Sequence, residues 1–133
     1  MSSEKQFSIQ LKLTKAKLLL SEIPILQQHQ LNATIINRLY YACYHATKAL
    51  LLTKDLIPKT HNGVISMLHK HFVAEGLFDI KEAAFFSRLM QERMDDDYSD
   101  FLSVDTETVR EFTAPAQQYI KYIEKLIQTN EHQ

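Results

Sequence analysis

The feature that most limits the fold of this chain is its shortage of residues that reverse the backbone sharply. Its 133 residues include only two glycines and three prolines. A β-sandwich or β-barrel of this length needs many tight turns, and such turns draw heavily on glycine and proline. Apolar residues also recur at steps of three and four, which is the spacing of one face of an α-helix. The sequence therefore predicts an all-α protein.

The apolar spacing predicts about five helices, which we expect to form an up-and-down bundle in a single domain over residues 1–133. The expected ranges are 4–22, 33–53, 61–75, 83–98 and a last helix that starts at Asp105 or Thr108. Neither a repeat nor a linker long enough to divide domains interrupts the chain. The second helix is expected to turn seven apolar residues inward, namely Ile35, Leu39, Ala42, Cys43, Ala46, Ala49 and Leu50.

Proline and asparagine predict where the first two helices meet. Pro24 is expected to end the first helix, because proline lacks the amide hydrogen that a helix interior needs. Residues 23–32 are then a connector, and Asn32 is the expected N-cap of the second helix.

Capping residues predict the later boundaries. Thr60 can cap the third helix, and Gly76 suits the left-handed residue that follows it. Thr108 and Glu111 match a capping box at the start of the last helix. Pro115 interrupts the apolar pattern of that helix, so we expect either a kink there or a later start.

Composition excludes several classes of function. The formal net charge is −1, so the chain has no global basic field for nucleic acid and any anion site must be local. The single cysteine, Cys43, excludes an intrachain disulfide, and its apolar neighbours indicate a buried thiol rather than a nucleophile. The first twenty residues carry charges throughout and lack the apolar run of a signal peptide or membrane span. We therefore expect a cytoplasmic protein without a membrane anchor.

The segment "NRLYYACYHATKALL" (residues 37–51) places ionisable groups on the second helix. Arg38 and His45 are seven residues apart, so they point within about 20° of each other at a separation of about 10 Å. Tyr41 lies between them. A cation, a phenol and an imidazole in a row can hold a phosphate and transfer a proton. The alternative is that Tyr41 and His45 lie at the margin of the core and that Arg38 pairs with an acid.

The fourth helix carries a cation on its inward face. Arg93 follows Phe86 and Met90 there, and an unpaired buried cation costs several kcal/mol. Asp97, four residues on, is the nearest partner within the helix. The macrodipole also opposes the acidic run at residues 95–97 near the helix end. This arrangement indicates a functional site, or alternatively a solvated acidic helix end with one structural Arg–Asp pair.

The histidines do not predict a metal site. His69 and His71 are two residues apart on a helix, so they point about 200° from each other and cannot share an ion. We expect no metal and no other cofactor, because the chain has no glycine-rich phosphate loop, dinucleotide fingerprint or nucleophile elbow. His61 stands beside the expected Thr60 cap, where a helix N-terminus suits contact with an anion. The alternative is a surface histidine in a turn.

Three ordered segments, "NRLYYACYHATKALL", "THNGVISMLHKHFV" and "RMDDDY", resemble the HEPN family (higher eukaryote and prokaryote nucleotide-binding). The resemblance covers residues from about 7 to 127 and is strongest to small stand-alone bacterial and archaeal members. It implies a bundle of four or five helices that forms a homodimer, with a groove at or near the dimer interface. Tyr40, Tyr44 and Leu51 would offer the apolar face that such a dimer needs.

Many HEPN proteins are metal-independent ribonucleases, which carry an Arg and, after four to six residues, a His near the end of a late helix. In that chemistry a base helps the ribose 2′-OH attack the adjacent phosphate, and the Arg stabilises the charge on phosphorus. Arg93 matches the motif Arg, but Tyr98 stands where a spacing of four would place the His. Arg38 and His45 have the spacing in a different helix. His61 would supply the missing imidazole if its helix starts beside Arg93.

The resemblance implies a protein that binds RNA or a nucleotide, as the ribonuclease toxin of a pair with a nucleotidyltransferase antitoxin that can adenylylate a Tyr next to the motif. Tyr98 is the candidate for that modification. The predicted catalytic residues are Arg93, His61, Asp97 and Tyr98, and the predicted phosphate- or nucleotide-binding residues are Arg38, Tyr41, His45 and Arg93. The alternative is a non-catalytic dimeric interaction module whose Arg–Asp–Tyr network is structural.

Overall fold

The computed structural model describes residues 2–98 and 104–131 of the protein, with every side chain in these ranges except those of residues 94–98 and 130–131. These residues form six α-helices and a short π-helix, and they contain no β-strand. The elements are α1 (Ser3–Ser21), α2 (Ile23–Gln28), α3 (Asn32–Leu52), α4 (His61–Leu68), η1 (His69–Val73), α5 (Ile80–Tyr98) and α6 (Thr106–Glu131). The prediction of an all-α bundle is confirmed.

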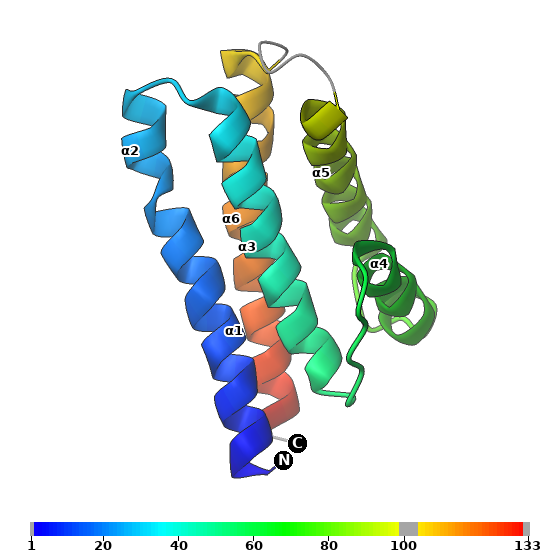
Figure 1. Ribbon diagram of the computed structural model, residues 1–133. Helices are drawn as coiled ribbons and strands as arrows, with labels where there is room; N and C mark the ends of the chain where they lie inside the picture. The colour runs from blue at the N-terminus through cyan, green and yellow to red at the C-terminus, as the bar shows by residue number, and fades with distance from the viewer. Residues whose placement is uncertain (1, 99–103, 132–133) are drawn as a thin grey trace.

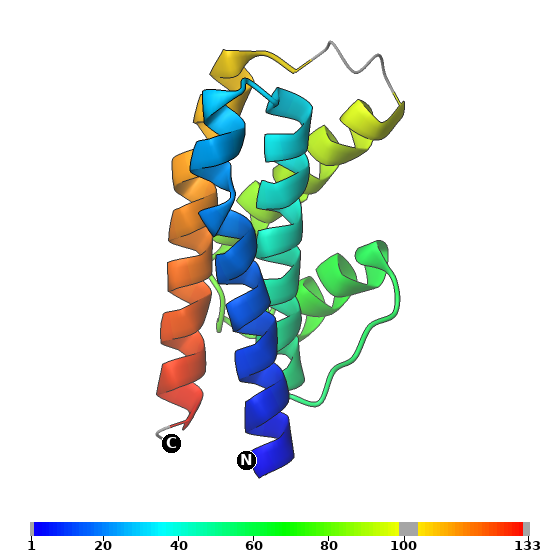
Figure 2. The ribbon, with the colours of Figure 1, turned by 60° about the vertical axis from the view of Figure 1, so that its left-hand side comes forward.

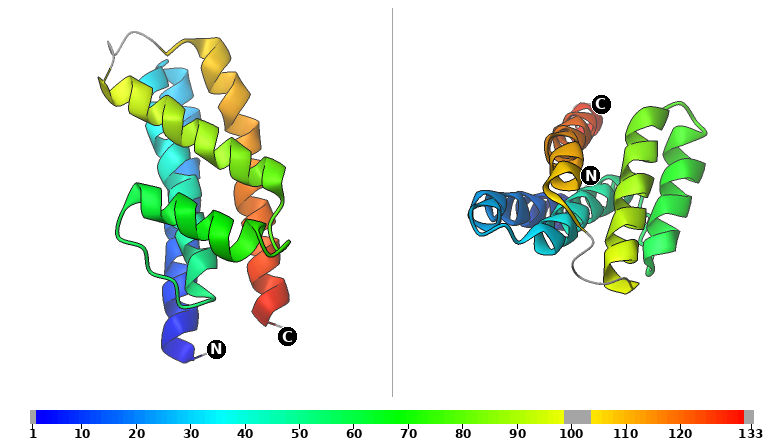
Figure 3. Two further views of the ribbon diagram at one scale, coloured as in Figure 1. Left: turned by 90° about the vertical axis from the view of Figure 1, so that its right-hand side faces the viewer. Right: turned by 90° about the horizontal axis from the view of Figure 1, so that it is seen from above.

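Four long helices, α1, α3, α5 and α6, alternate in direction, and α3 lies at their centre. In the view of Figure 1, α1 runs upward, α3 downward, α5 upward and α6 downward, so α1 begins and α6 ends at the same end of the molecule. Figure 2 shows α4 and α5 projecting from one side of α3. α4 lies across α3 and α5 crosses it obliquely (Figure 3). In all, α3 contacts α1, α2, α4, α5 and α6. Among the described residues, no helix is both long and apolar enough to span a membrane.

Burial of α3 extends well beyond one face. Twelve of its 21 residues are buried, and they include all seven of the predicted inward residues, each 0 % exposed. Tyr40 and Leu51 are also 0 % exposed, and Tyr44 is 9 % exposed. The prediction that these three residues offer a dimer face is wrong, because neighbouring helices of the same chain already cover them.

The junction between α1 and α3 differs from the predicted connector. Residues 23–28 form α2, and Pro24 lies in its first turn, where the missing amide hydrogen leaves no helical hydrogen bond unmade. Asn32 is the first residue of α3, with Leu31 in the N-cap position. The N-cap prediction for Asn32 is wrong, because its side-chain amide instead donates to the carbonyl of Val104 at 3.2 Å.

The predicted start of α4 is confirmed. The Thr60 hydroxyl accepts a hydrogen bond from the amide of Gly63 at 2.9 Å. A Cβ on Gly63 would lie 2.9 Å from that hydroxyl oxygen, so glycine leaves room for the cap. Gly76, with φ of +73°, adopts the predicted left-handed conformation after η1. The cap makes His61 the first residue of α4, against the side of α3.

The last helix starts earlier than its proline implies. Asp105 caps α6 by accepting from the amide and the hydroxyl of Thr108, both at 2.8 Å. The capping box predicted at Thr108 is therefore wrong, and so is a start beyond Pro115, which lies inside α6. The buried residues on both sides of that proline hold the helix against α3 and offset the lost hydrogen bond.

A fully buried pair of hydroxyl groups joins α3 to α6. Thr47 and Tyr119 are both 0 % exposed, and their oxygens lie 2.6 Å apart. The Thr47 hydroxyl also donates to the carbonyl of Cys43 at 2.7 Å. Since a hydroxyl has a single proton, Tyr119 is the donor to Thr47. Burial raises the pKa of Tyr119, which keeps the phenol protonated.

This geometry predicts unequal effects for two substitutions. Tyr119→Phe leaves Thr47 bonded to the Cys43 carbonyl, so we expect a loss of about 1 kcal/mol in the free energy of unfolding. Thr47→Val leaves a phenol hydroxyl buried without an acceptor and should cost more, up to about 3 kcal/mol. Urea unfolding of both variants at one pH measures the difference. Equal losses would contradict the assigned direction of the hydrogen bond.

Candidate functional site

Three tyrosines of α3 and the first residue of α4 form a packed group of rings, the aromatic cluster (Tyr40, Tyr41, Tyr44 and His61). The His61 ring stacks on Tyr40 and Tyr44, with centroid distances of 5.6 and 4.5 Å. It meets Tyr41 edge-on at 5.8 Å. Tyr40 and Tyr44 are buried whereas Tyr41 and His61 are half-buried. The cluster therefore has a solid inner side and an outer side that a ligand can reach.

A hydrogen bond fixes the orientation of the imidazole. The Tyr40 hydroxyl and Nδ1 of His61 lie 2.5 Å apart. In the described part of the chain, Nε2 of His61 makes no hydrogen bond. The ring is thus held through one nitrogen and can exchange a proton through the other.

Arg93 of α5 lies over the same rings. Its guanidinium carbon is 5.4 Å from the centroid of Tyr40 and 5.3 Å from that of Tyr41, within the range of a cation–π contact. Its Nη2 donates to the Tyr41 hydroxyl at 3.3 Å. The structure therefore brings Arg93, Tyr41 and His61 together from three different helices. From the sequence, His61 could supply the missing imidazole only if its helix starts beside Arg93. The observed arrangement meets that condition.

The surroundings keep the imidazole neutral and the buried phenols of Tyr40 and Tyr44 protonated. Burial, together with the charges of Arg93 and Lys48, lowers the pKa of His61. Burial and the neighbouring Tyr44 raise the pKa of Tyr40. Burial and Tyr41 likewise raise the pKa of Tyr44. A neutral imidazole beside a permanent cation can accept a proton while the cation holds negative charge.

Arg38 is held by an acid. Its Nε donates to the Glu22 carboxylate at 2.7 Å, and its Nη1 donates to the Asn37 side-chain oxygen at 2.9 Å. Glu22 lies at the junction of α1 and α2, so this pair joins that junction to α3. Of the two interpretations of Arg38, this geometry matches the one in which Arg38 pairs with an acid. The ion pair would have to open before Arg38 could bind a phosphate.

His45 lies on a different side of the cluster from His61. Its ring is 6.3 Å from that of Tyr41 and 5.7 Å from that of Tyr44, and it lines a hollow that contains three lysines of α1 and α3. Burial and these lysine charges lower its pKa to about 4. His45 is therefore neutral at pH 7 and faces cations.

The acidic end of α5 falls outside the described side chains. Asp97 and Tyr98 belong to the last turn of the helix, but neither their side chains nor those of residues 94–96 are described. The predicted Arg93–Asp97 pair and the roles of these two residues stay predictions. Among the described residues, no three side chains of His, Cys, Asp or Glu come together as metal ligands.

Sequence reasoning missed two members of the cluster. Tyr40 and Tyr44 lie four residues apart on the buried side of α3, where the sequence predicts a dimer surface. Their hydroxyl groups could have indicated a role in the cluster, because a tyrosine buried in a helical bundle needs a polar partner for its hydroxyl. For Tyr40 that partner is His61, which comes from another helix.

Comparison with known proteins agrees with the family resemblance. Residues 9–131 match the family described as HEPN domain. A UPF0332 protein of Thermotoga maritima is 29 % identical over 126 residues, which cover 95 % of this chain and 96 % of that protein. Two proteins of Methanocaldococcus jannaschii are named as candidate toxins. One is 48 % identical over 60 residues, or 45 % of each chain. The other is 32 % identical over 72 residues, or 54 % of this chain and 49 % of the relative.

The contact between Arg93 and the aromatic cluster predicts a shift in a titration. Arg93→Gln removes a positive charge that opposes protonation, so the pKa of His61 should rise. NMR titration of the histidine rings measures it, with Arg88→Gln as the control because Arg88 is an exposed cation of the same helix. An unchanged His61 pKa in Arg93→Gln would show that the guanidinium does not face the imidazole.

The surroundings of His45 predict acid sensitivity. Its pKa is about 4 in the folded chain and 6.5 without these neighbours, so the unfolded chain binds the extra proton first. The free energy of unfolding should therefore fall as the pH drops from 6.5 toward about 4. In His45→Gln this decline should be smaller, as urea unfolding across that range would measure. A decline of the same size in both proteins would assign it to other groups.

Proposed function

The chain belongs to the HEPN domain family, and on that premise we propose that it binds the phosphate groups of RNA and cleaves the strand at Arg93 and His61. The observation that carries this proposal is the meeting of these two side chains over the rings of Tyr40 and Tyr41. Arg93 comes from α5 and His61 from α4, so only the folded chain joins them.

The proposed reaction uses the protonation states that the site favours. Neutral His61, in the tautomer whose Nδ1–H donates to the Tyr40 hydroxyl, accepts the proton of a ribose 2′-OH through Nε2 while the 2′-oxygen attacks the adjacent phosphorus. Arg93 stabilises the negative charge that builds on the phosphate oxygens. The bond to the 5′-oxygen breaks, and that oxygen takes up a proton from water or from a neighbouring hydroxyl such as that of Tyr41. The products are a 2′,3′-cyclic phosphate and a free 5′-OH.

His61 takes the place of the motif histidine in this proposal. Tyr98 stands at the motif position, and a phenol has a pKa near 10, far from that of a base that works at pH 7. The lowered pKa of His61 keeps the imidazole in the form that accepts protons. Tyr98 and Asp97, next to Arg93 on α5, are proposed to contact the same strand or to orient the guanidinium.

We also propose a toxin role. The names of the two Methanocaldococcus jannaschii relatives point to it, and the family resemblance adds a nucleotidyltransferase antitoxin, with Tyr98 as a residue that this partner could modify. A homodimer and a cytoplasmic location belong to the same proposal. Both rest on the sequence.

A non-catalytic interaction module is the second candidate. It is favoured by the packing of Arg93 against Tyr40, a fully buried ring, since such a contact can serve to fix α5 on α3. In this alternative the guanidinium and the phenols form a structural network, and removal of Arg93 would lower stability without a separate effect on RNA.

Variants of Arg93 and His61 separate the two candidates. With labelled RNA, Arg93→Ala should lower the cleavage rate by about 10²- to 10³-fold, since it removes the charge that stabilises the transition state. His61→Gln should lower it by about 10²- to 10⁴-fold, since it removes the base. Arg88→Ala, a cation lost from the exposed side of the same helix, is the matched control.

Circular dichroism and urea unfolding of each variant accompany these assays. Normal RNA cleavage in folded Arg93→Ala, or in folded His61→Gln, would contradict the ribonuclease proposal. If wild type neither cleaves nor binds RNA, and Arg93→Ala loses stability, the interaction module stands.

A further inference from the structure

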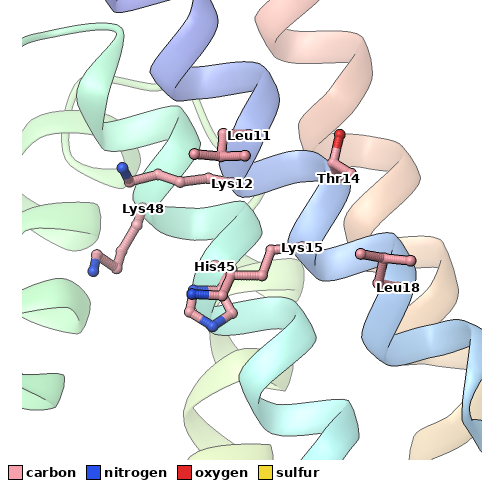
Figure 4. A pocket seen from close by; sticks show the side chains of 7 residues that line it. All are labelled: Leu11, Lys12, Thr14, Lys15, Leu18, His45 and Lys48. Carbon is pink, nitrogen blue, oxygen red and sulfur yellow. The ribbon is translucent and has the colours of Figure 1, made fainter.

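A hollow between α1 and α3 gathers three lysines around His45. It has a volume of about 310 Å³, and Figure 4 shows the side chains that α1 and α3 turn toward it. We call it the lysine hollow; the residues that matter here are Leu11, Lys12, Lys15, Leu18, His45 and Lys48. Two apolar side chains, Leu11 and Leu18, stand 56 % and 61 % exposed at its edge. The three lysines therefore lie beside exposed apolar surface and a neutral imidazole.

None of the three ammonium groups has a carboxylate partner among the described residues. Lys12 donates to the hydroxyl of Ser8 at 3.2 Å, and Lys48 lies 5.3 Å from the centroid of the Tyr44 ring. By contrast, two other lysines of α1 are paired: Lys5 with Asp55 and Lys17 with Glu124. The lysine hollow therefore concentrates positive charge that the fold itself does not neutralise.

The lysines also repel one another. Burial lowers the pKa of Lys12, and the charges of Lys48 and Lys15 lower it further. The same lysines depress the pKa of His45. Packing of this kind costs stability in the absence of a ligand, and an anion in the hollow would reverse that cost.

The lysine hollow continues in two directions. A second, smaller hollow of about 90 Å³ shares Lys12 and Lys48 and extends toward Pro58, so the two hollows adjoin at these lysines. Toward the aromatic cluster, the ring of Tyr44 contacts both His45 at 5.7 Å and His61 at 4.5 Å, and the ring of Tyr41 also contacts both. Lys48, which lies near this ring, also contributes to the lowered pKa of His61. The lysine hollow is therefore one ring away from His61 of the aromatic cluster.

We propose that the lysine hollow is a second phosphate-binding site, which holds a neighbouring phosphate of the same single-stranded RNA that Arg93 and His61 engage. The identity of the strand rests on the proposed function, whereas the affinity for phosphate rests on the hollow itself. Three ammonium groups and the N–H of a neutral His45 can all donate to one phosphate, and the apolar edge suits the face of a base or a ribose.

Histidine NMR tests the site directly. Inorganic phosphate, AMP and a short single-stranded RNA are each titrated into the full chain while the His45 and His61 ring signals are followed. We expect all three ligands to shift the His45 signals and to raise its pKa, because an anion offsets the lysine charges. RNA should give the tightest binding, since only a strand reaches both sites. Tighter binding of AMP than of RNA would overturn the assignment to a strand.

Charge variants supply a second measure. Each lysine that contacts a phosphate of a single strand contributes about 0.7 to the slope of log affinity against log salt. Lys12→Gln and Lys48→Gln should each lower the slope for RNA by about that amount. They should also unfold at the same or higher urea, since they relieve repulsion. Lys17→Gln is the matched control on α1, because its ammonium group pairs with Glu124 outside the hollow, and its slope should equal that of the wild type.

The outcomes separate this inference from the proposed function. If RNA shifts His61 but neither phosphate nor RNA moves His45, or if the slopes do not change, the second site is wrong while the Arg93 site stands. If phosphate moves His45 but Arg93→Ala does not alter RNA cleavage, the lysine hollow stands and the ribonuclease proposal fails. A His45 signal that responds to protein concentration and not to phosphate would assign the hollow to contact between two copies of the chain, which overturns the proposal.

Discussion

The central position of α3 is the constraint on which the rest of this structure depends. Five α-helices pack against it, and more than half of its residues are buried. A helix enclosed in this way must be apolar on most sides, and its small residues, such as Ala42, Ala46 and Ala49, let neighbouring backbones approach. Any polar group on it must find a partner in another helix, because an unsatisfied buried donor or acceptor costs about 1–3 kcal/mol.

The polar residues of α3 meet that requirement in different ways, and these differences produce the surfaces discussed above. Thr47 bonds within the core, to Tyr119 of α6, and serves the packing alone. Tyr40 bonds to His61 and so orients an imidazole at the outer edge of the bundle. Within the described ranges, His45 meets lysines and has no hydrogen-bond partner, and these lysines leave an excess of positive charge on the side that faces α1. One helix thereby connects a structural pair, a candidate reaction site and a basic hollow.

Much of the fold could be predicted from local patterns. The helix positions followed from the spacing of apolar residues, and the Thr60 cap and the left-handed Gly76 followed from backbone chemistry. Two of the errors share one cause: a tertiary contact overrode a local preference. Asn32 has the side chain of an N-cap, but it bonds to the carbonyl of Val104. Pro115 would end many helices, yet packing against α3 carries α6 through it.

By itself, the sequence determined that the chain is a helical bundle of the HEPN family, because apolar periodicity and three ordered motifs are properties of the linear chain. It also marked Arg93 and His61 as unusual, each for its place on a helix. Only the tertiary structure decided that these two side chains meet over Tyr40 and Tyr41, that Arg38 pairs with Glu22, and that His45 lies among lysines of α1. The reason is physical: helix spacing fixes the direction of a side chain around its own axis, whereas the crossing of α4 and α5 over α3 fixes which directions converge.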